Sequence, residues 1–119
     1  QPNDIIAEQA VLGSMLVDKD AVISAVELLK ADDFYREDNK EIYAAMFELY
    51  SLGKHIDMIT LKDQLTLRGT IEKVGGTEYI ATLIDNVPTT SNIESYVKIV
   101  EEKSISRKLI KAANGICSN

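Results

Sequence analysis

The chain has 119 residues, of which 45% are hydrophobic and 27% charged, as in an ordinary globular protein. A chain of this length forms one domain with a substantial core, and it has no low-complexity tract that would indicate disorder. Its 13 Lys and Arg against 19 Asp and Glu give a net charge of -6, which disfavours direct binding to DNA.

Residues that would mark a nucleic-acid, disulfide, metal or membrane site are few. The one basic cluster is interleaved with acidic residues: Lys103, Arg107, Lys108 and Lys111 beside Glu101 and Glu102. The single cysteine, Cys117, cannot form an internal disulfide, and the single histidine, His55, would need carboxylates to hold a metal. No apolar run approaches the roughly 18 residues that span a bilayer. We therefore expect an intracellular, reducing setting without metal or membrane contact.

Apolar residues recur at helical spacing along almost the whole chain, and strict alternation is scarce, which predicts an all-α protein. We expect a compact orthogonal helical bundle with helices over about 4–16, 18–29, 38–53, 60–69, 76–87 and 92–114. Helix starts are predicted from acceptor side chains. They are Asp4 (or Asn3), Asp18, Asp38 with Glu41, Thr60 with Asp63, and Ser91 with Glu94.

The helix over 38–53 has apolar residues on much of its circumference, so we expect it to be the central helix of the bundle. The link before it contains Phe34 and Tyr35, and we expect Phe34 to fill the core from a short loop. A glycine pair, Gly75 and Gly76, precedes the fifth helix, and Pro88 should end that helix.

The last predicted helix is longer than the others, about 34 Å at 1.5 Å per residue. Its apolar stripe changes course along the helix, from Ile93, Val97 and Val100 to Ile105, Leu109, Ala112 and Ile116. We expect the first half to lie on a head formed by residues 1–90. The second half, within residues 91–119, should present its stripe to something outside that head.

Gly13 lies inside the first predicted helix, where glycine costs roughly 1 kcal/mol relative to alanine. A phosphate-binding turn, a membrane segment or a close helix contact could each explain it. Glu8 and Gln9 interrupt a segment already too short for a membrane. A close contact, in which a neighbouring helix approaches the backbone, remains the best interpretation.

Candidate catalytic groups are better explained as structural features. The Gly75-Gly76 pair has neither the GxxxxGK[ST] spacing nor the lysine of a phosphate-binding loop, and it fits a turn with positive φ. Asp32-Asp33, and likewise Asp18 with Asp20, are interpreted as caps and dipole partners. His55 and Cys117 have no clear catalytic partner. A helix-turn-helix over 60–87 is also disfavoured, because GTEYIATLIDN contains no Lys or Arg.

Five blocks of sequence, in order, resemble the N-terminal domain of the bacterial replicative DNA helicase, the DnaB family. They are AEQAVLGSML at 7–16, DFY at 33–35, IDMITL at 56–61, VGGTEYIATL at 74–83 and VPTTSNIESYVKIVEEKSISRKLI at 87–110. The resemblance covers essentially the whole chain. One departure is Asn39, where family members usually carry histidine, and it affects at most a local cap or packing contact.

The resemblance implies a helical head followed by a helical hairpin, which the sequence enters but does not complete before Asn119. The parent protein would be a cytoplasmic bacterial helicase that uses ATP and Mg²⁺ in a RecA-like motor, and nothing in this chain resembles that motor. By the same resemblance, the domain would pair with other copies of itself into a hexameric collar and bind the primase C-terminal domain. A helicase loader is a further partner to consider.

We expect the chain to be a non-catalytic assembly and docking domain that needs no cofactor of its own. By position in the matched blocks, the candidate partner-binding residues are Tyr79, Ile105, Leu109, Ile110 and Ile116. Alternatively, Tyr79 and Ile110 belong to the core. Two other classes stay open: a stand-alone helical enzyme or ligand-binding module, which would need a pocket with convergent polar groups, and a DNA-bound regulator, which would show salt-dependent binding.

Overall fold

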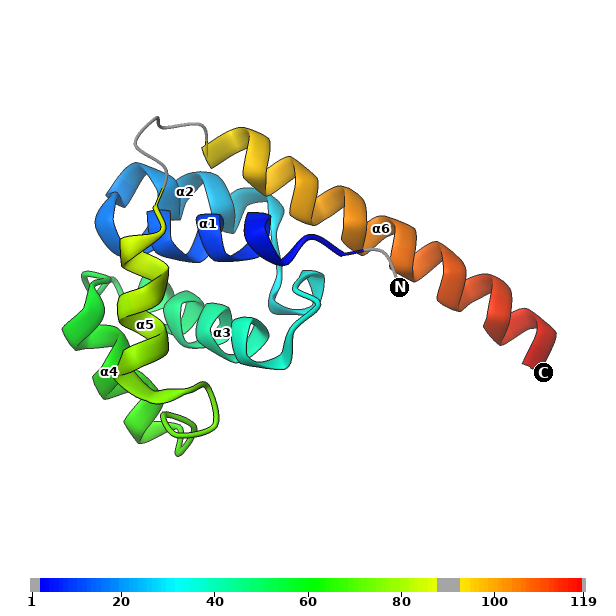
Figure 1. Cartoon of the computed structure of the whole chain (residues 1–119). Helices are drawn as coiled ribbons and strands as arrows, with labels where there is room; N and C mark the ends of the chain where they lie inside the picture. The colour runs from blue at the N-terminus through cyan, green and yellow to red at the C-terminus, as the bar shows by residue number, and fades with distance from the viewer. Residues whose placement is uncertain (1–2, 88–92, 119) are drawn as a thin grey trace.

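The computed structural model describes residues 3–87 and 93–118, with side chains up to residue 113, and this part of the chain contains helices joined by loops and no β-strand. The elements in order are α1 (Ile5–Val17), α2 (Lys19–Leu28), the short 3-10 helix η1 (Ala31–Asp33), α3 (Glu37–Ser51), α4 (Met58–Leu67), α5 (Gly76–Asp85) and α6 (Ile93–Ser118). Figure 1 shows a head built from the first five α-helices, with α6 running along it and beyond it. The prediction of an all-α fold is confirmed.

Helix starts agree with the sequence prediction at α1 and α2. The Asp4 carboxylate accepts the Ala7 N–H at 3.0 Å, and the Asp18 carboxylate accepts the Asp20 N–H at 2.9 Å. Pro88 and the Ser91 cap lie outside the described residues.

Two predicted helix starts are wrong. The capping box of α4 is formed by Asp57 and Thr60, three residues earlier than the predicted pair, because an aspartate with a hydroxyl at this spacing already satisfies the first N–H groups. At α3, the N-cap position is occupied by Arg36. Asp38, the predicted cap, lies inside the first turn and binds the Arg36 guanidinium at 2.5 Å.

The central helix is α1, and the prediction that residues 38–53 would form it is wrong. α1 contacts α2, α3, α5 and α6, and its buried positions face all directions. α3 leaves Phe47 and Tyr50 partly exposed. The sequence pattern did not show that α1 is central, because a polar residue, Glu8, and a residue without a side chain, Gly13, interrupt its apolar positions. Both residues are nevertheless buried.

Gly13 marks the place where α5 crosses α1. A Cβ atom at Gly13 would lie 2.2 Å from the Leu83 carbonyl oxygen and 2.8 Å from Cγ2 of Val87. No side chain fits at that distance, so the glycine is required by the close approach of the two helices. This confirms the close-contact interpretation. The turn before α5 is also as predicted, since Gly75 and Gly76 have φ of +99° and +67°.

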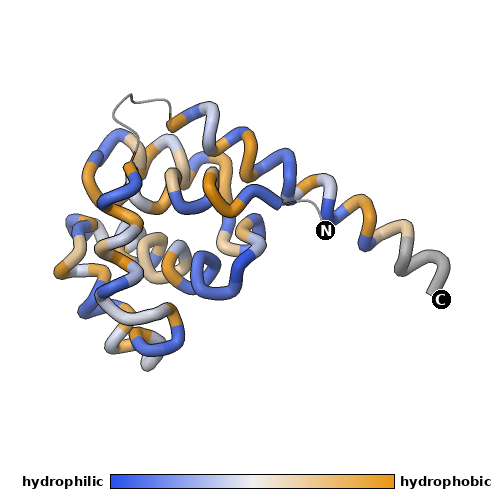
Figure 2. The backbone as a smooth tube through the Cα atoms, in the orientation of Figure 1, coloured by the Kyte–Doolittle hydropathy of each residue, from blue (hydrophilic) through white to orange (hydrophobic). Residues whose placement is uncertain are grey.

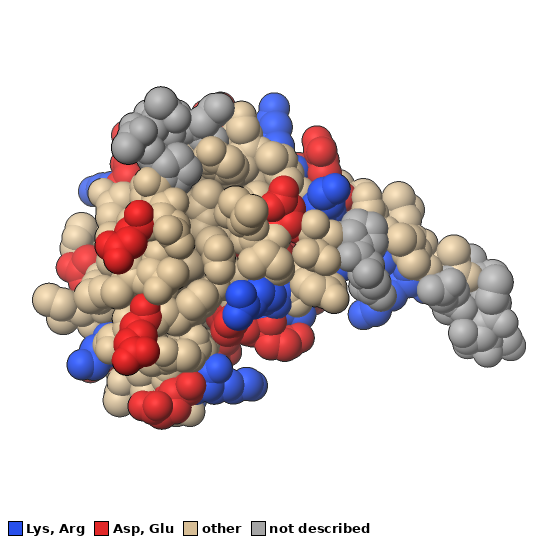
Figure 3. Space-filling model, in the orientation of Figure 1, with Lys and Arg blue, Asp and Glu red and all other residues tan. Residues whose placement is uncertain are grey.

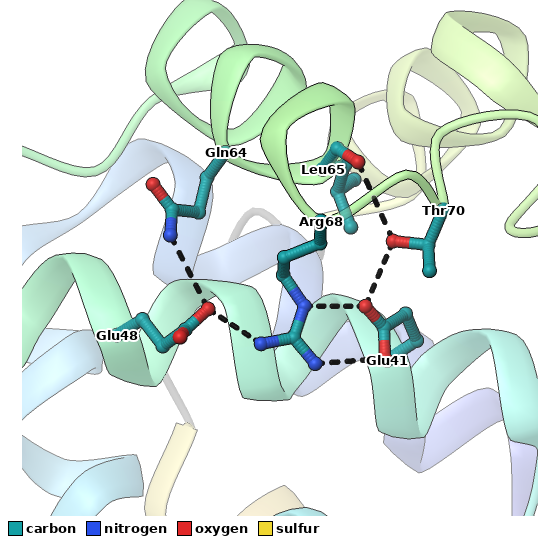
Figure 4. A network of polar contacts seen from close by, with 6 residues as sticks. All are labelled: Glu41, Glu48, Gln64, Leu65, Arg68 and Thr70. Carbon is teal, nitrogen blue, oxygen red and sulfur yellow. Dashed lines mark hydrogen bonds and ion pairs between the residues drawn. The ribbon is translucent and has the colours of Figure 1, made fainter.

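A polar network at the surface joins α3 to the C-terminal end of α4 (Figure 4). The Arg68 guanidinium donates to Glu41 at 2.5 and 3.0 Å and to Glu48 at 2.5 Å, and the Thr70 hydroxyl donates to Glu41 at 2.8 Å. These hydrogen bonds from Arg68 hold the pKa of both carboxyls below the ordinary value. The network fixes how α4 lies on α3.

Phe34 is buried as predicted and packs against the Tyr43 ring with a centroid distance of 4.9 Å. The Tyr43 hydroxyl donates to the Leu29 carbonyl at 2.7 Å, so the end of α2 is tied to α3. Burial raises the pKa of Tyr43 well above its ordinary value. The connection between α2 and α3 is therefore fixed to the core by both ring packing and a hydrogen bond.

Candidate protein interaction site

The long helix α6 begins on the head and then leaves it. Its first half buries Val97 and Val100 against the core, as the sequence predicts. Beyond the head, Figure 2 shows hydrophobic residues continuing along α6 among hydrophilic ones. With 26 residues the helix is about 39 Å long. It is therefore long enough to pack on the head with its first half and to contact a different surface with its second half.

A buried polar cluster around Asp33 holds the middle of α6. The Asp33 carboxylate accepts hydrogen bonds from the Lys30 N–H at 2.7 Å, the Ser104 hydroxyl at 2.6 Å and the Lys108 ammonium at 3.0 Å. The Arg107 guanidinium donates to the Asp33 carbonyl at 2.7 Å. Although burial works in the opposite direction, the three donors to the carboxylate hold the pKa of Asp33 below its ordinary value. Asp33 thus orients α6 where the apolar contacts end.

Ser104 and Arg107 continue the head-facing stripe of α6 in polar form. They follow Val97 and Val100 at intervals of three and four residues, which is the spacing of one helix face. Sequence reasoning missed this because it followed hydrophobicity alone, and it assigned Asp33 only a capping role. The regular spacing of these four residues could have indicated that Ser104 and Arg107 also face the head.

The other face of the same segment is apolar and exposed. Ile105 is 49% exposed, Leu109 67% and Ile110 40%, whereas Val97 is fully buried. Ile105 and Leu109 are four residues apart and share a face, with Ala112 also exposed. Ile110 is offset by about 100° from Leu109 around the helix. The side chain of Ile116 lies outside the described residues.

Tyr79 on α5 is half-buried and tied to two other helices. Its hydroxyl donates to the Asn39 side-chain oxygen at 2.5 Å and accepts from the Gln9 side-chain amide at 3.3 Å. The Arg36 guanidinium lies 5.4 Å from the ring centroid. Burial raises the pKa of Tyr79 above its ordinary value. Tyr79 therefore contributes to the packing of α5, and only part of its ring can meet a partner.

Behind Tyr79 lies a buried carboxylate that sequence reasoning did not identify. Glu8 accepts the Tyr35 N–H at 2.7 Å, the Arg36 N–H at 3.4 Å and the Asn39 side-chain amide at 3.0 Å. It satisfies backbone donors just ahead of α3 and so links α1 to α3. Asn39 is fully buried and joins Glu8 to Tyr79, which corrects the expectation that it makes only a local cap or packing contact.

The predicted partner-binding residues fall into two separate places. Ile105, Leu109 and Ile110 lie on the part of α6 beyond Val100, whereas Tyr79 lies on α5, which contacts α1 and α4. Figure 1 shows α5 and the C-terminal part of α6 at opposite sides of the molecule. Within one chain they do not form a single patch.

Groups considered for catalysis are dispersed. The His55 side chain is 74% exposed and lies 3.6 Å from the Asp57 carboxylate. Within residues 3–87 and the described side chains of α6, no three His, Cys, Asp or Glu residues come together as a metal site. Acidic and basic side chains are interspersed on the face shown in Figure 3. Among the described residues, no helix has the length and apolar character needed to cross a membrane.

The described part of the chain is thus an all-helical domain with a protruding helix whose outer face is apolar. A sequence model of the DnaB-like helicase N terminal domain matches residues 1–102. The chain belongs to this family.

Curated relatives are longer proteins with the same kind of domain. The chain is 44% identical over 115 residues to the replicative DNA helicase DnaB of Leifsonia xyli subsp. xyli, and 41% identical over 118 residues to that of Geobacillus stearothermophilus. These alignments cover 97% and 99% of this chain but 25% and 26% of the relatives. The chain therefore spans about a quarter of the length of these helicases.

Solved structures share the fold. The N-terminal domain of DnaB helicase from Mycobacterium tuberculosis matches with a TM-score of 0.93 at 40% identity, covering 98% of this chain and 85% of that one. A DnaB-like replicative helicase, described with its interactions with primase, matches with a TM-score of 0.87 at 27% identity, covering 98% of this chain and 27% of that one. The fold of this chain is therefore shared with these two proteins.

Proposed function

We propose that this chain is the assembly and docking domain of a replicative DNA helicase that unwinds DNA at the replication fork. It would pair with copies of itself within a hexameric collar and bind the C-terminal domain of primase. The observation that carries the proposal is the exposed apolar face of α6, where Ile105 and Leu109 lie outside the head. A few apolar anchors of this kind carry most of the binding energy in helix-on-helix contacts.

The two places found in the structure suit two contacts. The face with Ile105 and Leu109 would meet a copy of the domain or a following helix, with Ile116 extending it. Tyr79 on α5 would contribute to primase binding, and Ile110, which lies on α6 away from Tyr79, would take part in a separate primase contact on the long helix. Holding primase on the helicase raises its local concentration at the fork, which is a scaffolding mechanism that requires no chemistry in this domain. A helicase loader would compete for, or share, part of this surface.

We propose that this chain hydrolyses no nucleotide, and that it consists of a head at 1–90 followed by the long helix at 91–119. ATP and Mg²⁺ would be bound by the motor of the parent protein. By its family, the parent helicase would act in the bacterial cytoplasm. Purified chain incubated with ATP and Mg²⁺ should release no phosphate above background. Measurable turnover would favour the alternative of a stand-alone enzyme.

Light scattering of this chain, beside a chain extended through the family's hairpin, tests assembly and docking together. Each should be measured with and without the primase C-terminal domain. We expect the extended chain to self-associate and to bind primase, and this chain to do so more weakly. Two monomers of identical behaviour that ignore primase would contradict the proposal. A binding signal to DNA that falls steeply with salt would favour the DNA-bound regulator instead.

A further inference from the structure

A groove lies at the end of the head farthest from the C-terminal end of α6. It is lined by the end of α1, the first turn of α2, the end of α3 and the loop 53–56, and its volume is about 380 Å³. In Figure 1 these helix ends meet at the left of the head. No residue of α5 or α6 lines it, so it is separate from the surfaces proposed above for primase and for other copies.

The groove has an apolar floor and apolar walls. Its floor is formed by the buried side chains of Leu16, Val22 and Ile56. Its walls are more exposed: Val17 is 56%, Ile23 41% and Tyr50 43% exposed. A cavity of this size accepts one or two apolar side chains, and exposed apolar surface gathered around a hollow is typical of a binding site.

The aromatic wall extends beyond the groove. The Phe47 ring lies 6.4 Å from the Tyr50 ring, centroid to centroid, and is itself 41% exposed. Tyrosine and phenylalanine are enriched at protein interfaces because they bury a large area with little loss of conformational freedom. The surface available to an occupant is therefore longer than the cavity itself, as a peptide needs.

The charged side chains at the rim determine whether an acidic or a basic ligand is favoured. Lys19 and Lys54 line the groove together with one acid, Asp18, whose carboxylate already accepts the N–H of the first turn of α2. His55 also lines the groove, but its imidazole lies 3.6 Å from the Asp57 carboxylate and is not counted as a positive charge. On a chain of net charge -6, the two lysines are a local excess of positive charge. An acidic ligand is favoured here, whereas most of the surface repels it. Two lysines over an apolar floor are too few for a nucleic acid, which is held mainly through many phosphate contacts.

We propose that this groove binds a short acidic segment of a partner protein. Its apolar side chains enter between Ile23 and Tyr50, and its carboxylates lie against Lys19 and Lys54. The site would give the domain a further docking surface that involves neither α5 nor α6. A partner bound there could be held on the helicase while primase occupies the other surface.

Selection of random short peptides displayed on phage, with the folded chain as bait, tests the proposal directly, because the peptides themselves serve as the probe. We expect enrichment of peptides with Leu, Ile or Phe next to Asp or Glu. Synthetic versions measured by calorimetry should lose at least about tenfold in affinity, or about 1.4 kcal/mol, in Lys19→Glu/Lys54→Glu and in Ile23→Glu. Ile59→Glu is the matched control, since Ile59 is 78% exposed on α4 and does not line the groove.

Thermal unfolding of each variant separates loss of binding from loss of fold, and all four substituted positions are exposed. Failure to enrich any peptide whose binding depends on the groove would overturn the proposal, as would enrichment of basic or uncharged peptides. If light scattering shows self-association that Ile23→Glu abolishes, a second copy of the chain is the occupant, and the proposal is wrong.

Discussion

Helices α5 and α6 both pack on α1 and both carry residues proposed to meet partners, but they are held in different ways. α5 approaches the α1 backbone at Gly13, and its Tyr79 is hydrogen-bonded to Asn39 and Gln9. α6 is held by apolar side chains and then by Asp33, and its outer face makes no contribution to the head. Substitutions on α5 should therefore change stability and binding together, whereas those on the outer face of α6 should separate them.

The largest effect should come from the crossing of α1 and α5. Helix propensity alone would make Gly13→Ala stabilising by about 1 kcal/mol. Because the added Cβ would meet the Leu83 carbonyl oxygen, we expect the free energy of unfolding to fall by about 2 kcal/mol instead. Urea denaturation measures this. Ser14→Ala, one position along α1, is the control and should change little, and a gain in stability for Gly13→Ala would show that the crossing is looser than described.

A comparable effect should come from the polar anchor of α6. Asp33→Ala removes the acceptor of three hydrogen bonds, and leaves the buried Ser104 hydroxyl without this partner. We expect a loss of about 2 kcal/mol in the free energy of unfolding. The neighbouring Asp32 is exposed, so Asp32→Ala is the matched control. Equal effects of the two substitutions would mean that Asp33 contributes only its negative charge and that its hydrogen bonds add nothing to stability.

The same anchor should respond to acid. The folded-state pKa of Asp33 is lower than the ordinary value of 3.8, so its contribution to stability is complete above 3.8 and is lost as pH falls through the folded value. The difference in unfolding free energy between the wild type and Asp33→Asn should therefore shrink as pH falls below 3.8. A difference that grows in acid would contradict this assignment.

Substitution of Tyr79 should give a smaller change and a test of its two roles. Tyr79→Phe removes the hydroxyl, which leaves the buried Asn39 oxygen without a donor and costs about 1 kcal/mol. Primase binding should be nearly unchanged if the ring makes the contact, and it should be lost in Tyr79→Ala. Tyr50→Phe, at an exposed position, is the control for stability. Loss of primase binding in Tyr79→Phe without loss of stability would place the hydroxyl itself at the partner.

Much of the architecture could be predicted from the chain, since helix spacing, the caps Asp4 and Asp18 and the glycine turn before α5 depend on local rules. What escaped prediction depends on groups far apart in sequence. Glu8 meets the start of α3, Asn39 meets Tyr79, and Asp33 meets Ser104. Polar residues in a helix are ordinarily assigned to solvent, and only the assembled fold supplies the donors that allow them to be buried. The exposed apolar stripe of α6, in contrast, could be predicted from the sequence, because its residues diverge from the stripe that packs on the head.

The smallest effect on stability, and the sharpest test of function, should come from the outer face of α6. Leu109 is 67% exposed, so Leu109→Asp should change the free energy of unfolding by less than about 0.5 kcal/mol. Because an anchor in an apolar contact is replaced by a charge, self-association of the extended chain should be abolished in light scattering. Ile59→Asp, similarly exposed but on α4, should leave association unchanged. If Leu109→Asp instead destabilises the isolated chain by several kcal/mol, this face packs against the head. Stability and binding would then change together on α6, as expected for α5.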